Sequence, residues 1–215
     1  MKLFITGIGT DVGKTIASAI VVEALEADYW KPIQAGDLNN SDSHKVKGLA
    51  SLSSPLARVG IREKGEVFPN AYALNTPASP HLAAQLDGIT IDIKEIQEPK
   101  TNNNLVIEGA GGILVPLNDN DCVIDLIQKD YKVIVVSRHY LGSINHTLLT
   151  IESLQNRKIG VAGIIFSGDE NNATEEIILK KTGVKFIGRI GNEPYFDANV
   201  ISYYADKFRE NLLAL

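Results

Sequence analysis

Short runs of apolar residues alternate with longer, mixed segments along most of the chain. The apolar runs are rich in β-branched residues and lack polar alternation, which is typical of strands buried on both faces of a sheet. The mixed segments between them are long enough to form helices, which favours right-handed β-α-β crossovers and a parallel sheet. The pattern predicts strands at residues 3–5, 29–31, 105–107, 132–137, 161–166 and 184–190.

The clearest helical segments lie near the two ends of the chain, at residues 14–27 and 200–213. Residues 39–101 are less regular and are interrupted by prolines, so we expect short helices and loops there. No internal repeat or low-complexity linker divides the sequence. We therefore expect residues 1–215 to form a single α/β domain, with helices flanking a mostly parallel central sheet.

Composition and charge narrow the class of protein. Hydrophobic residues make up 44% of the chain and charged residues 22%, which excludes an intrinsically disordered protein. A net charge of −5 disfavours nucleic-acid and membrane partners. The single cysteine, Cys122, excludes an intramolecular disulfide and a cysteine-built zinc site. The apolar runs are too short for a membrane span or a signal peptide, so we expect a cytoplasmic protein.

The strongest chemical signal is the glycine-rich segment from Thr6 to Thr15, which follows a predicted strand and opens a predicted helix. A phosphate-binding loop requires this context, because glycines let backbone N–H groups converge on phosphate oxygens at a helix N-terminus. Lys14 is expected to reach the β- and γ-phosphates, and Thr15 to offer its hydroxyl to Mg²⁺. Gly7 and Gly13 are separated by five residues, whereas the usual pattern has four. A plain strand-to-helix turn is the alternative.

Three further side chains are candidates for this site, and two of them, Glu108 and Lys31, end predicted strands, where ligands bind in open parallel sheets. Glu108 is a candidate magnesium contact followed by glycines that would let a substrate approach; its alternative is a surface glutamate. Lys31 is a second lysine that would stabilise charge during phosphoryl transfer; its alternative is a lysine that extends to solvent. Asp42 is another candidate magnesium contact, and its alternative role is a helix N-cap.

A helix is predicted to begin at Gly142 and Ser143, after the strand at 132–137 and at the same edge of the sheet. Free N–H groups at such a helix start could bind a carboxylate. The histidines are scattered along the sequence, so we expect ordinary buried or exposed histidines and no histidine-built metal site.

Read together, these segments resemble dethiobiotin synthetase, a family of ATP-dependent enzymes of biotin biosynthesis. The resemblance covers nearly the whole chain and rests on the order and spacing of its motifs. It also explains the extra residue in the phosphate loop, which this family carries. The matching motifs are Thr6-Gly7-x-x-Thr10-x-x-Gly13-Lys14-Thr15, Lys31-Pro32-x-x-x-Gly36, Ser41-Asp42, Pro77-x-Ser79-Pro80-His81, Val106-x-Glu108-Gly109-Ala110-Gly111-Gly112, Pro116-Leu117 and Leu141-Gly142-x-Ile144-Asn145-His146.

The resemblance implies a homodimer with a P-loop NTPase-type fold that joins CO2, in equilibrium with bicarbonate, to 7,8-diaminopelargonate with hydrolysis of ATP. One amine first forms a carbamate, whose oxygen attacks the γ-phosphate to give a carbamic–phosphoric anhydride. The second amine then closes the five-membered urea ring and expels phosphate. The products are dethiobiotin, ADP and phosphate. Lysines, Mg²⁺ and backbone dipoles suit this chemistry, because the site must bring anions together and neutralise them.

The resemblance also implies roles for individual residues. Lys14 and Lys31 are implied as the catalytic lysines, and Thr15, Asp42 and Glu108 as ligands of Mg²⁺. The implied nucleotide contacts are Thr10, Asp11, Val12, Gly13, Lys14, Thr15, Asp42, Glu108, Gly109, Ala110, Gly111 and Ser167. The implied substrate contacts are Lys31, Ala35, Gly111, Ser143 and Asn145, of which the last two belong to the helix start that would meet the substrate carboxylate across the dimer interface.

This sequence departs from the family pattern at three places. Ala35 stands where the family usually has Thr or Ser, so a substrate hydrogen bond is lost or comes from Gln34. Ser167 stands where the family usually has an Asn that reads the base, and Gly191 where a proline usually follows the strand. Both of these bear on the base pocket, and ATP is expected from the family resemblance.

Three other classes of protein are alternatives to this hypothesis. Cobyrinate-type amidases carry an added glutamine-hydrolysing domain with a catalytic Cys, for which this chain is too short. Nucleotide-switch ATPases of the partitioning or septum-site type place a lysine early in the loop, where this chain has Ile8 and Gly9. A non-catalytic nucleotide-binding module would not need Lys31, Asp42 and Glu108 together.

Overall fold

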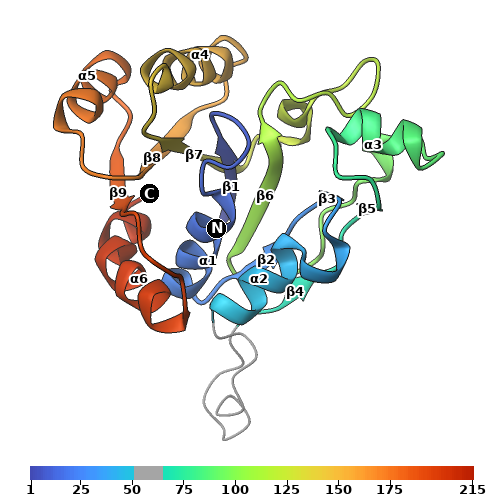
Figure 1. The fold of residues 1–215 in the computed structure, drawn as a ribbon, viewed down its shortest axis with the longest axis horizontal. Helices are drawn as coiled ribbons and strands as arrows, with labels where there is room; N and C mark the ends of the chain where they lie inside the picture. The colour runs from blue at the N-terminus through green and yellow to red at the C-terminus, as the bar shows by residue number, and fades with distance from the viewer. Residues whose placement is uncertain (51–64) are drawn as a thin grey trace, which may run out of the picture.

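A computed structural model describes residues 1–50 and 65–215. A seven-stranded sheet runs through it in the order β4-β2-β6-β1-β7-β8-β9 (Figure 1). All its neighbouring strands are parallel, so their carboxyl ends lie along one edge. The strands are β1 (Lys2–Gly7), β2 (Asp28–Trp30), β4 (Val67–Phe68), β6 (Leu105–Gly112), β7 (Tyr131–Arg138), β8 (Val161–Ser167) and β9 (Phe186–Ile190).

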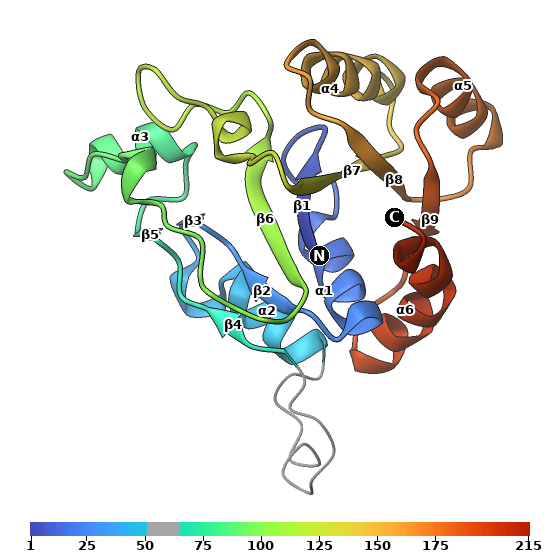
Figure 2. The same ribbon diagram turned by 180° about the vertical axis from the view of Figure 1, so that it is seen from behind.

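Helices cover both faces of this sheet, as the two opposite views show (Figures 1 and 2). One face carries α1 (Lys14–Leu25), α2 (Asp42–Leu49) and α6 (Ala198–Leu213). The other carries α3 (Pro80–Leu86), α4 (Ser143–Asn156) and α5 (Asn172–Thr182). Short 3₁₀ turns lie at Leu38–Asn40, Ile93–Glu95 and Val123–Leu126. In the described part of the chain, no helix combines the length and the apolar character that crossing a membrane requires.

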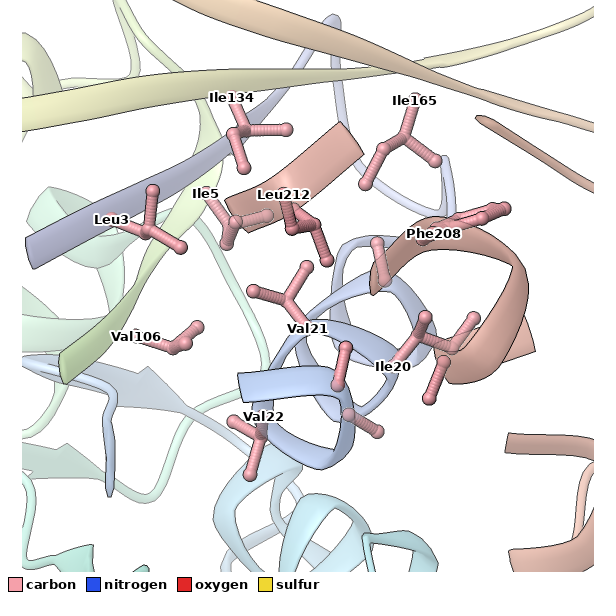
Figure 3. Packing of buried hydrophobic residues seen from close by; sticks show 14 of the residues in the cluster. Leu3, Ile5, Ile20, Val21, Val22, Val106, Ile134, Ile165, Phe208 and Leu212 are labelled. Carbon is pink, nitrogen blue, oxygen red and sulfur yellow. The ribbon is translucent and has the colours of Figure 1, made fainter. Parts of the chain in front are cut away.

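Alternate residues of the strands feed two separate hydrophobic clusters, because successive side chains of a strand point to opposite faces. Leu3 and Ile5 of β1 pack with α1 and α6, whereas Phe4 between them packs with the opposite layer. Figure 3 shows the first cluster, in which Phe208 and Leu212 of α6 lie over the sheet beside α1. Both faces of the central strands are therefore buried, as their unbroken apolar runs predicted.

The predicted parallel sheet is confirmed, with differences at the ends of its elements. Strand β6 continues to Gly112, past the predicted end at residue 107, so Glu108 lies within the strand. The first helix ends at Leu25 rather than at residue 27, and the last strand begins at Phe186 rather than at residue 184. Strand β2 ends at Trp30, so Lys31 follows the strand instead of ending it. These changes move no side chain away from the carboxyl edge of the sheet.

The expectation of only short helices and loops at residues 39–101 was wrong for part of that region. The edge strand β4 lies there and pairs with β2. Strand β5 (Tyr72–Leu74) lies there too and pairs with β3 (Ile33–Ala35) in a second, two-stranded sheet. Residues 51–64 of this region lie outside the described part of the chain.

Candidate active site

A cleft of about 880 Å³ follows the carboxyl edge of the sheet. Segments that follow β1, β2, β6 and β9 contribute to its walls, together with the last residues of β7 and β8. The parallel topology explains this convergence, because every strand delivers its following loop to the same edge. Most of the residues predicted to bind nucleotide and substrate line the cleft: Thr10, Asp11, Gly13, Lys14, Thr15, Lys31, Ala35, Asp42, Glu108, Ala110, Gly111 and Ser167.

The glycine-rich loop after β1 has the backbone that an anion site needs. Gly13 precedes α1 with a φ of 96°, in the left-handed region that favours glycine, and no side chain caps the helix. The first N–H groups of α1 therefore have no side-chain acceptor and lie at the positive end of the helix dipole. A Cβ at Gly13 would lie 3.1 Å from Ser167 Oγ, so this loop passes close to the end of β8.

Lys14 is the first residue of α1 and is buried, with 7% of its surface exposed. Its Nζ donates a hydrogen bond to the carbonyl oxygen of Gly9 at 2.7 Å. Burial lowers the pKa of Lys14 from 10.5 to about 8, although the charge of Glu108 opposes this effect. A phosphate in the cleft would stabilise the charged ammonium, because its negative charge offsets the cost of burying the positive charge.

Lys31 forms a buried ion-pair cluster with the two predicted acidic residues. Its Nζ lies 2.5 Å from Asp42 Oδ2 and 3.1 Å from Glu108 Oε1. Burial alone would lower the pKa of Lys31, but the charges of Glu108 and Asp42 outweigh it and raise the pKa. Only 5% of Lys31 is exposed, so the alternative of a lysine extending to solvent was wrong.

The three predicted magnesium ligands lie together. The Thr15 hydroxyl lies 2.9 Å from Asp42 Oδ1 and 3.1 Å from Glu108 Oε1. Hydroxyl and carboxylate oxygens are ligands that Mg²⁺ prefers, usually completed by water and substrate phosphates. Within residues 1–50 and 65–215, no group of three or more His, Cys, Asp and Glu side chains could hold a metal by itself. The donor set therefore fits a magnesium ion shared with a nucleotide.

The alternative N-cap role of Asp42 was wrong. The cap of α2 is Ser41, whose hydroxyl accepts a hydrogen bond from the His44 N–H, and Asp42 is the first residue of the helix. The Asp42 carboxylate instead faces Thr15 and Lys31. Lys31 holds the pKa of Asp42 below its usual range, even though burial pushes that pKa upward.

Four predicted contacts do not line the cleft. Val12 is buried in the hydrophobic cluster beneath the loop, and Gly109 packs against Phe4, which lies 3.2 Å from the position of a Cβ. Ser143 and Asn145 line a neighbouring cavity of about 860 Å³ at the start of α4. The predicted helix start at Gly142 and Ser143 is confirmed, since α4 begins at Ser143.

Other residues in and around the cleft were not predicted. Tyr29 of β2 is fully buried and donates its hydroxyl to Glu108 Oε2 at 2.9 Å. It lies two residues before Lys31, and residues at that spacing along a strand point to the same face, so the sequence contained a signal for it. Arg138 lines both cavities and donates to the carbonyl oxygen of Asp11 at 3.0 Å. Lys45 of α2 lines the cleft beside Asp42. Nothing in the sequence singled out these last two.

The comparisons with known proteins agree with this geometry. A family model described as "AAA domain" matches residues 1–200. An ATP-dependent dethiobiotin synthetase of Christiangramia forsetii is 61% identical to this chain, and the match covers 97% of this chain and 96% of that protein. The chain belongs to the dethiobiotin synthetase family. Another member, from Cytophaga hutchinsonii, is 49% identical over 98% of both chains.

Membership of the dethiobiotin synthetase family confirms the resemblance inferred from the motifs. A solved structure with the same fold is the MinC:MinD cell division protein complex of Aquifex aeolicus, with a TM-score of 0.61 and 16% identity over 100% of this chain and 96% of that chain. Identity this low indicates a shared fold and nothing more. It confirms the predicted P-loop NTPase-type architecture, and it does not favour the septum-site function over the synthetase function.

Proposed function

We propose that this protein is an ATP-dependent dethiobiotin synthetase that joins CO2 to 7,8-diaminopelargonate. The observation that carries this proposal is the convergence of Lys14, Lys31, Asp42 and Glu108 in one cleft, in a chain with 61% identity to a protein of that name. A nucleotide-binding module would need the loop around Lys14. The buried cluster around Lys31 goes beyond that need, since it places a second cation where phosphate would be transferred.

Lys14 and the first N–H groups of α1 would bind the β- and γ-phosphates. Lys31 would bind the carbamate oxygen and the γ-phosphate, holding two anions close enough to react and neutralising the charge that develops between them. The carbamate oxygen would attack phosphorus and ADP would leave, giving the carbamic–phosphoric anhydride. The second amine would then attack the carbamate carbon and expel phosphate. These steps need no protein nucleophile.

Thr15, Asp42 and Glu108 would hold Mg²⁺. When bound there, the ion supplies positive charge that neutralises the phosphate oxygens. The remaining nucleotide contacts would be Thr10, Asp11 and Gly13 of the loop, with Val12 and Gly109 contributing only backbone, and with Ala110, Gly111 and Ser167 along the wall.

The diamine would lie between the main cleft of one protomer and the start of α4 in its partner. Lys31, Ala35 and Gly111 line the cleft on the side of the reacting phosphate, and Gln34 lies beside Ala35. Ser143 and Asn145 would bind the substrate carboxylate at the N-terminus of α4, contributed by the partner protomer of a homodimer. Residues 1–215 would act as one domain in the cytoplasm, where ATP is available, with small molecules rather than nucleic acid or membrane as partners.

The proposal predicts that Lys14→Ala and Lys31→Ala each reduce dethiobiotin formation by about 100-fold or more, because each removes a cation from a water-poor phosphate site. The assay supplies diaminopelargonate, bicarbonate, ATP and Mg²⁺ and measures dethiobiotin directly. Lys47→Ala is the matched control, because Lys47 is exposed on α2. A rate near that of the wild-type protein for Lys31→Ala would contradict the role given to Lys31.

A second measurement separates the synthetase from a nucleotide switch. The synthetase should release phosphate from ATP only when both diamine and bicarbonate are present. Steady hydrolysis of ATP without diamine, together with no dethiobiotin, would favour the switch function instead.

A further inference from the structure

The cleft extends beyond the phosphate loop toward the carboxyl ends of β8 and β9. Ile190 ends β9, and Gly191, Asn192 and Glu193 follow it along the wall of the cleft. Lys31 and Glu108 lie on the opposite side of the loop, since β2 and β6 flank β1 on one side and β7, β8 and β9 on the other. This inference rests on the proposed function: with the γ-phosphate directed toward Lys31, the nucleoside extends toward β8 and β9.

This end of the cleft has the character of a pocket for a planar ring. Ile16, Ile190 and Phe196 give it apolar walls. Ligand pockets combine such walls with a few fixed polar groups that determine orientation and specificity. The carboxylate of Glu193, a half-buried side chain in the wall of the cleft, provides such a polar group.

The Glu193 carboxylate is held in place by a buried tyrosine. Tyr204 of α6, with 5% of its surface exposed, donates its hydroxyl to Glu193 Oε1 at 2.6 Å. The same hydroxyl accepts a hydrogen bond from the N–H of Gly191 at 3.0 Å. The hydroxyl therefore ties the turn after β9 to the carboxylate. A side chain fixed in this way discriminates better than a mobile one, because little freedom is lost when a ligand binds.

We propose that Glu193 reads the exocyclic amino group of the nucleotide base, and that Tyr204 is the positioning residue that orients its carboxylate. An ionised carboxylate offers only acceptors, so it pairs with an amino group and repels a carbonyl oxygen. Adenine carries such an amino group at C6 and cytosine at C4, where guanine and uracil carry oxygen.

The test compares nucleotides that carry either an amino group or an oxygen at this position. ATP and inosine triphosphate share a purine but carry an amino group and an oxygen at C6, and CTP and UTP form the equivalent pyrimidine pair. Wild-type kcat/KM should favour ATP over inosine triphosphate by about tenfold or more, because a site built to pair with an amino group rejects an oxygen there. A preference for ATP over inosine triphosphate and for CTP over UTP would indicate that the amino group is recognised on purines and pyrimidines alike. A preference for ATP over inosine triphosphate alone would indicate recognition of adenine.

The variant Glu193→Gln should reduce the ATP-to-inosine preference by about tenfold, because a rotated amide can donate to the C6 oxygen. Tyr204→Phe should reduce it by a smaller factor, with the change in KM and not in kcat, since the base is remote from the reacting atoms. The double variant should resemble Glu193→Gln alone, because Tyr204 acts through the carboxylate. Tyr203→Phe, at the exposed neighbouring position on α6, is the matched control and should leave the preference unchanged.

Equal preferences in the wild-type protein and Glu193→Gln would overturn the inference, and so would a wild-type protein that does not distinguish ATP from inosine triphosphate. Binding of the same nucleotides, measured by calorimetry without diamine, separates this outcome from failure of the proposed function. A wild-type protein that binds ATP selectively through Glu193 but forms no dethiobiotin would support the inference and contradict the synthetase. If the wild-type protein forms dethiobiotin and Glu193→Gln leaves the nucleotide preference unchanged, the result would support the synthetase and contradict the role of Glu193.

Discussion

Glu108 is the residue at which most of the site's interactions meet. Its Oε1 lies within 3.1 Å of both the Thr15 hydroxyl and the Lys31 ammonium, and its Oε2 accepts from the Tyr29 hydroxyl. Only 1% of its surface is exposed. A buried carboxylate with every oxygen occupied is held in one orientation, which a metal ligand requires.

Replacing this carboxylate by an amide tests its role toward the metal. We expect Glu108→Gln to raise the Mg²⁺ concentration needed for half-maximal activity by about tenfold, because a neutral amide is a weaker ligand for a hard cation. Dethiobiotin formation measured across a magnesium titration gives the result, with Glu152→Gln on the exposed face of α4 as control. An unchanged titration curve would remove Glu108 from the metal site.

The sequence predicted those site residues whose role depends on their immediate neighbours. Gly13, Lys14 and Thr15 follow one another at the junction of a strand and a helix, so a local pattern was enough. The contact between Tyr29 and Glu108 joins residues 79 positions apart, and the contact between Arg138 and Asp11 joins residues 127 apart. Such contacts depend on the order of strands in the sheet, which no local pattern contains.

At the level of elements, α6 holds together the layer that supports the phosphate loop. Phe208 is 2% exposed and belongs to the cluster shared by α1, α6 and the sheet (Figure 3). Its ring occupies the space beside Gly188 of β9, where any Cβ would collide with it. The absence of a side chain at Gly188 thus lets α6 pack closely on the end of the sheet.

Truncation of this ring should weaken the fold more than it changes the chemistry. We expect Phe208→Ala to lower the free energy of unfolding by about 3–5 kcal/mol, through lost apolar burial and the cavity left behind. Urea denaturation followed by circular dichroism measures the loss. Leu213→Ala, at an exposed position of the same helix, should change stability by less than about 0.5 kcal/mol. Similar losses for the two variants would contradict the packing described for α6.

Long elements were predicted well, whereas among the described strands of two or three residues only β2 was predicted. Strands with unbroken β-branched runs, such as β7 and β8, have a strong signal in the sequence. Strands β3, β4 and β5 have only two or three residues each, too few to show any periodicity. They are strands because a neighbouring backbone pairs with them, and that neighbour is set by the tertiary structure.

For the whole molecule, the start of α4 leaves apolar side chains unburied beside the second cavity. Leu141 is fully exposed, and Tyr140 and Ile144 are 42% and 38% exposed. Exposed apolar residues grouped beside a cavity are typical of a protein–protein interface. In the proposed homodimer, a second copy of the chain would cover them and would complete the proposed carboxylate site at Ser143 and Asn145.

A charge placed at this surface should separate the protomers. We expect Leu141→Asp to shift the protein from dimer to monomer in analytical ultracentrifugation and to raise the KM for diaminopelargonate, because the diamine site would lose the partner's helix start. Leu86→Asp, at an exposed position at the end of α3, should leave both unchanged. A Leu141→Asp protein that sediments like the wild-type protein would place the interface elsewhere.

The ion pairs of Lys31 couple the binding of the metal ion to the binding of the nucleotide. Asp42 and Glu108 already have a cationic partner in the Lys31 ammonium, so a divalent ion must compete with that ammonium for their oxygens. A phosphate that attracts the ammonium releases the same oxygens to the ion. Metal and nucleotide should therefore bind synergistically, each increasing the affinity of the other by an equal factor, because such coupling is reciprocal.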